Sequence, residues 1–143
     1  MSRVRVLGPV LAAAALAGAV MASDASAAPK DPVEARYTPG YQRCLNAPEG
    51  QSTYGMIECA SGELKIQDAR LNGAYRKAMA GLNPRQKAKL LAAQRAWVAF
   101  RDAECASFED EDWGTLSRIN AADCVLTLTV KRTIDLEGYP PGT

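Results

Sequence analysis

The sequence predicts an all-α fold: a three-helix antiparallel bundle with an irregular N-terminal arm, stapled by two disulfides. Three observations lead to this class. Apolar residues recur at the helical period through most of residues 52–139. Short turn segments separate these periodic stretches. Four cysteines form an even set in a chain that begins like an exported protein.

Residues 1–27 have the three parts of a secretory signal peptide. Arg3 and Arg5 form a positive start, residues 6–21 are apolar and rich in Ala and Leu, and Ala25-Ser26-Ala27 has the small residues of a cleavage site. A membrane anchor is the alternative, but the apolar run is shorter than the about 20 residues that cross a bilayer. We therefore expect an exported protein, periplasmic or secreted, with no membrane contact after cleavage.

The charge and residue content restrict the function of the mature domain. The chain has 17 basic and 16 acidic residues, of which two and one lie in the signal peptide, so the remainder is close to neutral. A nucleic-acid partner requires a basic surplus and is not predicted. The chain contains no His, so the usual general base and nucleophile pairs of enzymes are missing. We predict no catalytic activity, no cofactor and no metal site.

The first elements in chain order are an arm and a long helix. Residues 28–51 form the irregular arm, because helix-breaking residues punctuate it: Pro29, Pro32, Pro39, Gly40, Pro48 and Gly50. The first helix is expected from Thr53 to Leu82. Its main stripe repeats at spacings of seven and four residues: Ile57, Leu64, Leu71, Ala78 and Leu82.

A second helix is expected from Pro84 to about Phe108. Asn83 is a natural N-cap, Pro84 suits the first helical position, and Gln86 is placed to complete a capping box. The tight turn at Asn83 makes the first two helices antiparallel.

An acidic turn, residues 109–114, leads to a third helix from Thr115 to Glu137. Within this helix, Val125–Val130 (VLTLTV) has the β-branched residues of a strand, but the longer helical period favours helix. The helical domain ends at residue 139, and residues 140–143 form a short tail.

The cysteines are expected to form disulfides rather than a metal site, because the chain has no CxxC spacing and no His. The antiparallel turn brings Cys59 level with Cys105, and the third helix returns Cys124 towards Cys105. The positions of the cysteines along the bundle axis do not by themselves decide which cysteines pair. Helical phase turns Cys59 away from the main stripe, towards the arm that carries Cys44. This phase favours the pairs Cys44–Cys59 and Cys105–Cys124.

Three segments of the sequence share a recognisable pattern. They are Leu71-Asn72-x-x-Tyr75, Ala93-Gln94-Arg95-Ala96-Trp97-x-x-Phe100-Arg101-Asp102-x-x-Cys105, and Cys124-x-x-x-Leu128-Thr129-x-x-Arg132. Together they resemble the LprI-like family of exported bacterial proteins, named after a lysozyme inhibitor, over residues 44–139. The resemblance implies an all-helical, disulfide-bonded envelope or secreted protein, and it implies lysozyme inhibition. This chain departs from the namesake in lacking a lipid-bearing Cys.

The residues of this pattern also have a structural interpretation. Gln94 and Arg101 lie on the helix face of Trp97, which we interpret as a core residue. Polar groups on that face need partners, since each unpaired buried group costs about 1–3 kcal/mol. Asp102 is expected to reach Arg132 or a Thr of the third helix. We predict a structural polar network, with a ligand or partner site as the alternative, made of Asp68, Asn72, Gln94, Arg101, Asp102 and Arg132.

The acidic turn is the predicted partner-binding surface: Glu109, Asp110, Glu111, Asp112 and Trp113. Its carboxylates would steer it towards a basic lysozyme, while Trp113 either anchors the contact or caps the end of the bundle. Carboxylates repel the two catalytic carboxylates of a lysozyme cleft, so a neutral residue of the turn or Arg118 would have to enter it.

Two functions therefore remain in view. The working hypothesis is an exported binding protein that inhibits a lysozyme. The alternative is a structural or accessory cell-envelope protein with another partner. An enzyme that uses paired carboxylates of the turn is disfavoured, because four adjacent acids in a polar turn are usually solvated.

Overall fold

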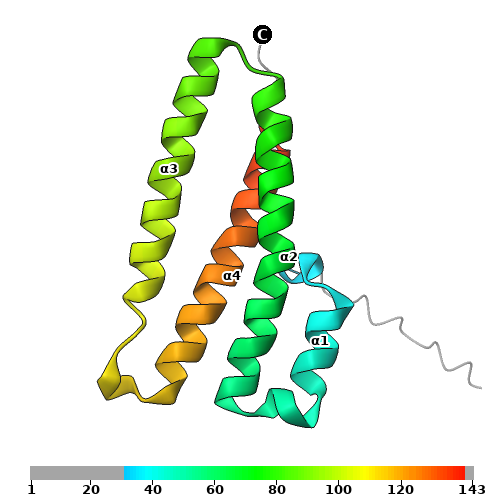
Figure 1. The fold of residues 1–143 in the computed structure, drawn as a ribbon, viewed down its shortest axis with the longest axis vertical. Helices are drawn as coiled ribbons and strands as arrows, with labels where there is room; N and C mark the ends of the chain where they lie inside the picture. Colours follow the sequence, from blue (N-terminus) through cyan, green and yellow to red (C-terminus); the bar gives the residue numbers. More distant parts are fainter. Residues whose placement is uncertain (1–30, 141–143) are drawn as a thin grey trace, which may run out of the picture.

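The computed structural model describes residues 31–140, and this part of the chain is all-α (Figure 1). The predicted signal peptide, residues 1–27, and most of the predicted tail lie outside the described residues. The helices are α1 (Pro39–Asn46), α2 (Thr53–Ala80), α3 (Pro84–Ala106) and α4 (Thr115–Glu137). A short 3₁₀ turn at Glu34–Arg36 precedes α1, and two others lie between helices, at Pro48–Gln51 and Glu111–Trp113. The predicted fold class, all-α with two disulfides, is confirmed.

The long helices begin where the sequence predicts. Asn83 Oδ1 accepts a hydrogen bond from Gln86 N at 3.0 Å, and Gln86 Oε1 accepts one from Asn83 N at 2.9 Å, so the predicted capping box forms. Ser52 caps α2 by accepting from Gly55 N at 3.0 Å. The segment Val125–Val130 lies inside α4, which rules out the strand alternative.

The N-terminal arm differs from the irregular segment that was expected, because it contains the helix α1. Its prolines flank this helix instead of interrupting it. Pro39 takes the first helical position, where a fixed φ and a missing N–H are tolerated, and Pro48 follows the helix end. Thr38 caps α1 by accepting a hydrogen bond from Tyr41 N at 3.1 Å. A short helix therefore fits between the breakers that argued against a long one.

The three long helices run up, down and up, but they do not pack equally. α2 and α4 lie side by side along most of their length, whereas α3 packs on α4 and diverges from α2 as it leaves the Asn83 turn (Figure 1). As a consequence, Leu90 and Cys105 are the buried residues of α3.

The main core cluster lies at the end of the bundle where all three long helices meet. Its buried members come from α2, the turn, α3 and α4: Leu71, Ala74, Leu82, Leu90 and Leu136. Trp97 is partly buried and packs against this cluster, so it sits at the edge of the core. Leu126 and Val130 continue the buried face of α4 towards the opposite end. None of the helices between residues 31 and 140 combines the length and the apolar composition of a membrane span.

Candidate functional site

The two disulfides have the pairing that helical phase favours. Cys44 joins Cys59 with their Cα atoms 5.7 Å apart, and Cys105 joins Cys124 at 5.5 Å. The second bond links the last turn of α3 to α4. It therefore holds together the two helices that flank the acidic turn, and it limits how far this turn can open.

The acidic turn projects from the open end of the bundle, and its four carboxylates, Glu109 to Asp112, are exposed. Asp110 Oδ1 accepts a hydrogen bond from Asp112 N at 2.8 Å and thereby caps the 3₁₀ turn. Gly114 has φ +66°, a left-handed conformation that suits glycine, and the chain reverses there into α4. Trp113 is 59% exposed and Leu116 is 60% exposed, so Trp113 does not cap the bundle.

A hollow of about 530 Å³ lies against this turn, lined by Glu109, Asp110, Glu111, Gly114, Thr115, Ser117 and Arg118. A second cavity of about 450 Å³ lies between α2, α3 and α4. Its lining residues are Ile57, Asp102, Cys105, Ala106, Glu109, Arg118, Ala121, Ala122 and Val125. Glu109 and Arg118 line both, so the two spaces adjoin.

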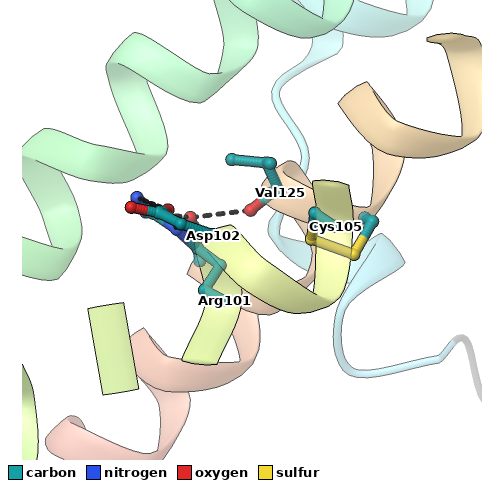
Figure 2. A network of polar contacts seen from close by, with 6 residues as sticks. Arg101, Asp102, Cys105 and Val125 are labelled. Carbon is teal, nitrogen blue, oxygen red and sulfur yellow. Dashed lines mark hydrogen bonds and ion pairs between the residues drawn. A yellow bond between two sulfur atoms is a disulfide. The ribbon is translucent and has the colours of Figure 1, made fainter. Parts of the chain in front are cut away.

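Arg101 is the centre of the polar contacts between α3 and α4 (Figure 2). Its Nε and Nη2 donate to Asp102 Oδ1 at 3.0 and 2.8 Å, and its Nη1 donates to Thr129 Oγ1 at 3.3 Å. Thr129 is fully buried and donates to the Val125 carbonyl at 2.7 Å. Figure 2 shows this chain of contacts beside the Cys105 disulfide. It helps to hold α3 against α4.

Arg132 forms a second contact between the same helices. Its Nε donates to Gln94 Oε1 at 3.0 Å. Both guanidinium groups lie over the Trp97 ring, with the carbon of Arg101 at 5.2 Å and that of Arg132 at 5.9 Å from the ring centroid. Such cation–π contacts explain how the Trp97 face accommodates two cations near the core.

The structure does not bring the six predicted network residues together. Asn72 donates to Asp68 at 3.1 Å on the exposed side of α2, and among the described residues neither is hydrogen-bonded to Gln94 or Arg101. The divergence of α2 and α3 is the reason, because a network with members on both helices required the two helices to pack. Asp102 contacts Arg101 instead of Arg132, and it is Arg101 that reaches a Thr of α4.

A different polar cluster fastens the arm to α2. Glu63 is 3% exposed, and its carboxylate accepts from Thr38 N at 2.9 Å, Thr38 Oγ1 at 2.6 Å and Gln67 Nε2 at 2.6 Å. Gln67 also donates to the Arg36 carbonyl at 2.8 Å. Sequence reasoning missed this cluster. A signal was available, because Glu63 and Gln67 follow Cys59 at spacings of four residues and lie between the faces of Cys59 and Leu71, both buried.

The arm has further contacts with α4. Arg36 donates to both carboxylate oxygens of Glu137, at 3.1 and 2.5 Å, and this hydrogen-bonded pair lowers the pKa of Glu137. Tyr37 and Thr127 are joined by a hydroxyl–hydroxyl hydrogen bond at 3.1 Å. Burial, the largest cause, and the nearby Asp123 raise the pKa of Tyr41 to about 12. The arm is thus hydrogen-bonded to both α2 and α4.

These features define a class: a small helical protein, stapled by two disulfides, whose most distinctive exposed surface is an acidic turn carrying a tryptophan. Comparison with known proteins identifies the family. The description "Lysozyme inhibitor LprI" matches residues 44–136, a span that contains all four cysteines and the acidic turn. The chain belongs to this family.

The chain is also similar to an uncharacterized protein from Rhizobium meliloti (strain 1021). The two are 32% identical over 94 residues, which covers 55% of this chain and 67% of the relative. No solved structure matches the chain.

Proposed function

We propose that this protein is an exported binding protein that inhibits a lysozyme. The observation that carries the proposal is membership of the lysozyme-inhibitor family over residues 44–136, which is nearly the whole helical domain. Two disulfides support export, because such bonds persist in oxidising compartments outside the cytoplasm.

The acidic turn is the surface that we assign to the contact. Four exposed carboxylates in a nearly neutral domain create a local negative field, and such a field accelerates association with a basic protein. Trp113 supplies an exposed aromatic group beside them, of the kind that dominates binding energy at interfaces. Many lysozymes are basic, so charge and apolar contact favour the same partner.

The charge of the turn also limits how inhibition can work. A lysozyme cleft contains two catalytic carboxylates, and carboxylates of the turn placed beside them would be repelled. We therefore propose that the acids contact the basic surface around the cleft. Arg118, which is exposed and lies next to the turn, is the cation available to face the catalytic groups.

The test is a lysis assay with the purified, oxidised mature protein against chicken-type and goose-type lysozymes, with affinity measured by calorimetry at low and high salt. We expect dose-dependent inhibition that weakens as salt increases. The turn variant Asp110→Asn, Glu111→Gln, Asp112→Asn keeps the Asp110 capping oxygen as an amide oxygen. It should lose about tenfold or more in affinity and most of the salt dependence.

A matched control removes the same number of exposed carboxylates elsewhere: Glu58→Gln, Asp68→Asn, Asp135→Asn. This variant should inhibit like the wild type. If the protein neither inhibits nor binds either lysozyme class, the proposal fails for those classes. If both triple variants lose affinity equally, the acidic turn is not the contact surface.

A further inference from the structure

The bundle has an unfilled apolar space at the end near the acidic turn. The 450 Å³ cavity between α2, α3 and α4 has walls made mainly of apolar or small side chains: Ile57, Cys105, Ala106, Ala121, Ala122 and Val125. We call this space the apolar groove. The groove is open because α3 diverges from α2 (Figure 1). In addition, Ala121 and Ala122 of α4, which form its floor, have small side chains.

The groove extends along both walls as exposed or half-exposed apolar surface. Val98 lies seven residues before Cys105 and Leu91 seven before Val98, so both share the face of α3 that lines the groove. They are 37% and 38% exposed. On α2, Leu64 lies seven residues after Ile57 and is half-buried. These opposing apolar residues would cover one another if α2 and α3 packed, but the helices diverge.

Covalent and polar contacts support the open arrangement. The Cys105–Cys124 disulfide fixes the end of α3 on α4, and Arg101 Nη1 donates to Thr129 Oγ1 of α4 at 3.3 Å. Both sets of contacts join α3 to α4, and neither draws α3 towards α2. These contacts therefore hold α3 on α4 with the groove open beside it.

The entrance to the groove is strongly acidic. Glu109 and Arg118 line both the groove and the adjoining 530 Å³ hollow, where Asp110 and Glu111 are also present. The acidic turn carries four carboxylates, whereas Arg118 contributes one positive charge. A ligand for this site needs an apolar group for the groove and positive charge for its entrance.

We propose that the apolar groove receives an apolar side chain, flanked by Lys or Arg, from a protruding segment of the lysozyme that this protein inhibits. This inference rests on the proposed function and deepens it. The partner inserts a side chain into this protein at the same time as the acidic turn contacts the partner's basic surface. Trp113 and Leu116 extend the contact beyond the groove.

A second copy of this chain is a poorer occupant on electrostatic grounds. In a twofold dimer the same patch faces itself. The acidic turns of two copies would then lie close together, and juxtaposed like charges disfavour association.

The experiment fills the groove and measures lysozyme affinity by calorimetry. Ala106→Phe introduces a large side chain at an exposed position that lines the groove, and Ala122→Leu raises its floor. Ala103→Phe is the matched control, because Ala103 is exposed on the same helix but does not line the groove. Circular dichroism and the melting temperature establish that each variant is folded. We expect each filled variant to lose about tenfold or more in affinity and the control to stay near wild type.

The outcomes separate this inference from the proposed function. If the acidic-turn variant loses binding while Ala106→Phe and Ala122→Leu keep wild-type affinity, the groove proposal is overturned and lysozyme inhibition stands. If the wild type binds no lysozyme, both proposals fail. A concentration-dependent dimer in sedimentation that Ala106→Phe abolishes would overturn the proposal in favour of a second copy. As a second readout, lysozyme should shift the methyl NMR signals of Ile57, Ala122 and Val125 and leave that of Ala103 unchanged.

Discussion

The buried carboxylate of Glu63 offers the sharpest test of how the arm is held. Its three hydrogen bonds come from Thr38 N, Thr38 Oγ1 and Gln67 Nε2. Hydrogen bonds to charged groups contribute about 1.5–3 kcal/mol each. Their sum overestimates the loss in Glu63→Ala, because burying the carboxylate has its own desolvation cost. Gln67 also keeps its bond to the Arg36 carbonyl. We expect a loss of about 3 kcal/mol in the free energy of unfolding.

A loss of this size is large for such a domain, whose total stability is expected to be about 5–15 kcal/mol. It corresponds to a fall in melting temperature of about 10 °C or more. The assay is denaturant and thermal unfolding of the oxidised protein, followed by far-ultraviolet circular dichroism. The control is Glu58→Ala, which removes an exposed carboxylate from the same helix and should change stability by about 0.5 kcal/mol or less.

The double variant Glu63→Ala, Thr38→Val tests the assigned partner. Because Thr38→Val removes the Oγ1 donor to Glu63 but keeps the backbone N–H donor, the two changes share one hydrogen bond. They should therefore be non-additive, with an interaction energy of about 1 kcal/mol or more. A loss below about 1 kcal/mol for Glu63→Ala, or additive effects in the double variant, would refute the reasoning that this cluster fastens the arm.

Three further predictions concern the disulfide at the turn, the packing around α2, and alkaline pH. Replacing Cys105 and Cys124 by Ser opens a loop with a sequence separation of 19 residues. The double variant should lose about 3 kcal/mol in the free energy of unfolding, measured with denaturant, and should bind lysozyme more weakly. Unchanged affinity would mean that the turn keeps its shape without the bond. Gly55→Ala would place its Cβ inside the van der Waals distance of the Glu49 carbonyl, while Gly62→Ala meets nothing within 4 Å. The first should therefore destabilise the protein, and the second should stabilise it by about 0.5–1 kcal/mol because alanine favours helix; equal melting temperatures would contradict this. Burial raises the pKa of Tyr41 from 10.0 to about 12, so its neutral phenol stabilises the fold fully below pH 10, and this contribution is lost as pH rises towards 12. Tyr41→Phe should flatten the stability profile in that window. Tyrosinate absorbance in the wild type should show late titration by Tyr41 and also by Tyr37, whose pKa burial raises as well.

Local chemistry explains why much of the fold could be predicted. A cap involves residues three positions apart, so the Asn83–Gln86 box could be recognised without knowledge of the rest of the molecule. Helical phase is also local, and it turned Cys59 towards the arm, which favoured the observed Cys44–Cys59 bond. The helix α1 was missed because prolines were counted as breakers, although Pro39 occupies the one helical position that it suits.

The candidate site depended on contacts between distant parts of the chain. The predicted network placed Asp68 and Asn72 of α2 together with residues of α3, which assumed that a tight turn makes two helices pack throughout. In the structure α3 packs on α4 and diverges from α2, so Arg101 bonds to Asp102 and Thr129. The same divergence leaves the apolar groove open, and no local sequence pattern predicts this groove.

The sequence by itself determined the helical class and the starts of the three long helices, and it favoured the observed cysteine pairing. Each of these depends on residues near one another along the chain or on a single helix face. Only the tertiary structure decided which polar groups are partners, that Glu63 is buried, and that Trp113 is exposed beside an open groove. These depend on how much apolar surface each helix can bury against the others, a quantity that belongs to the packed bundle and to no single segment.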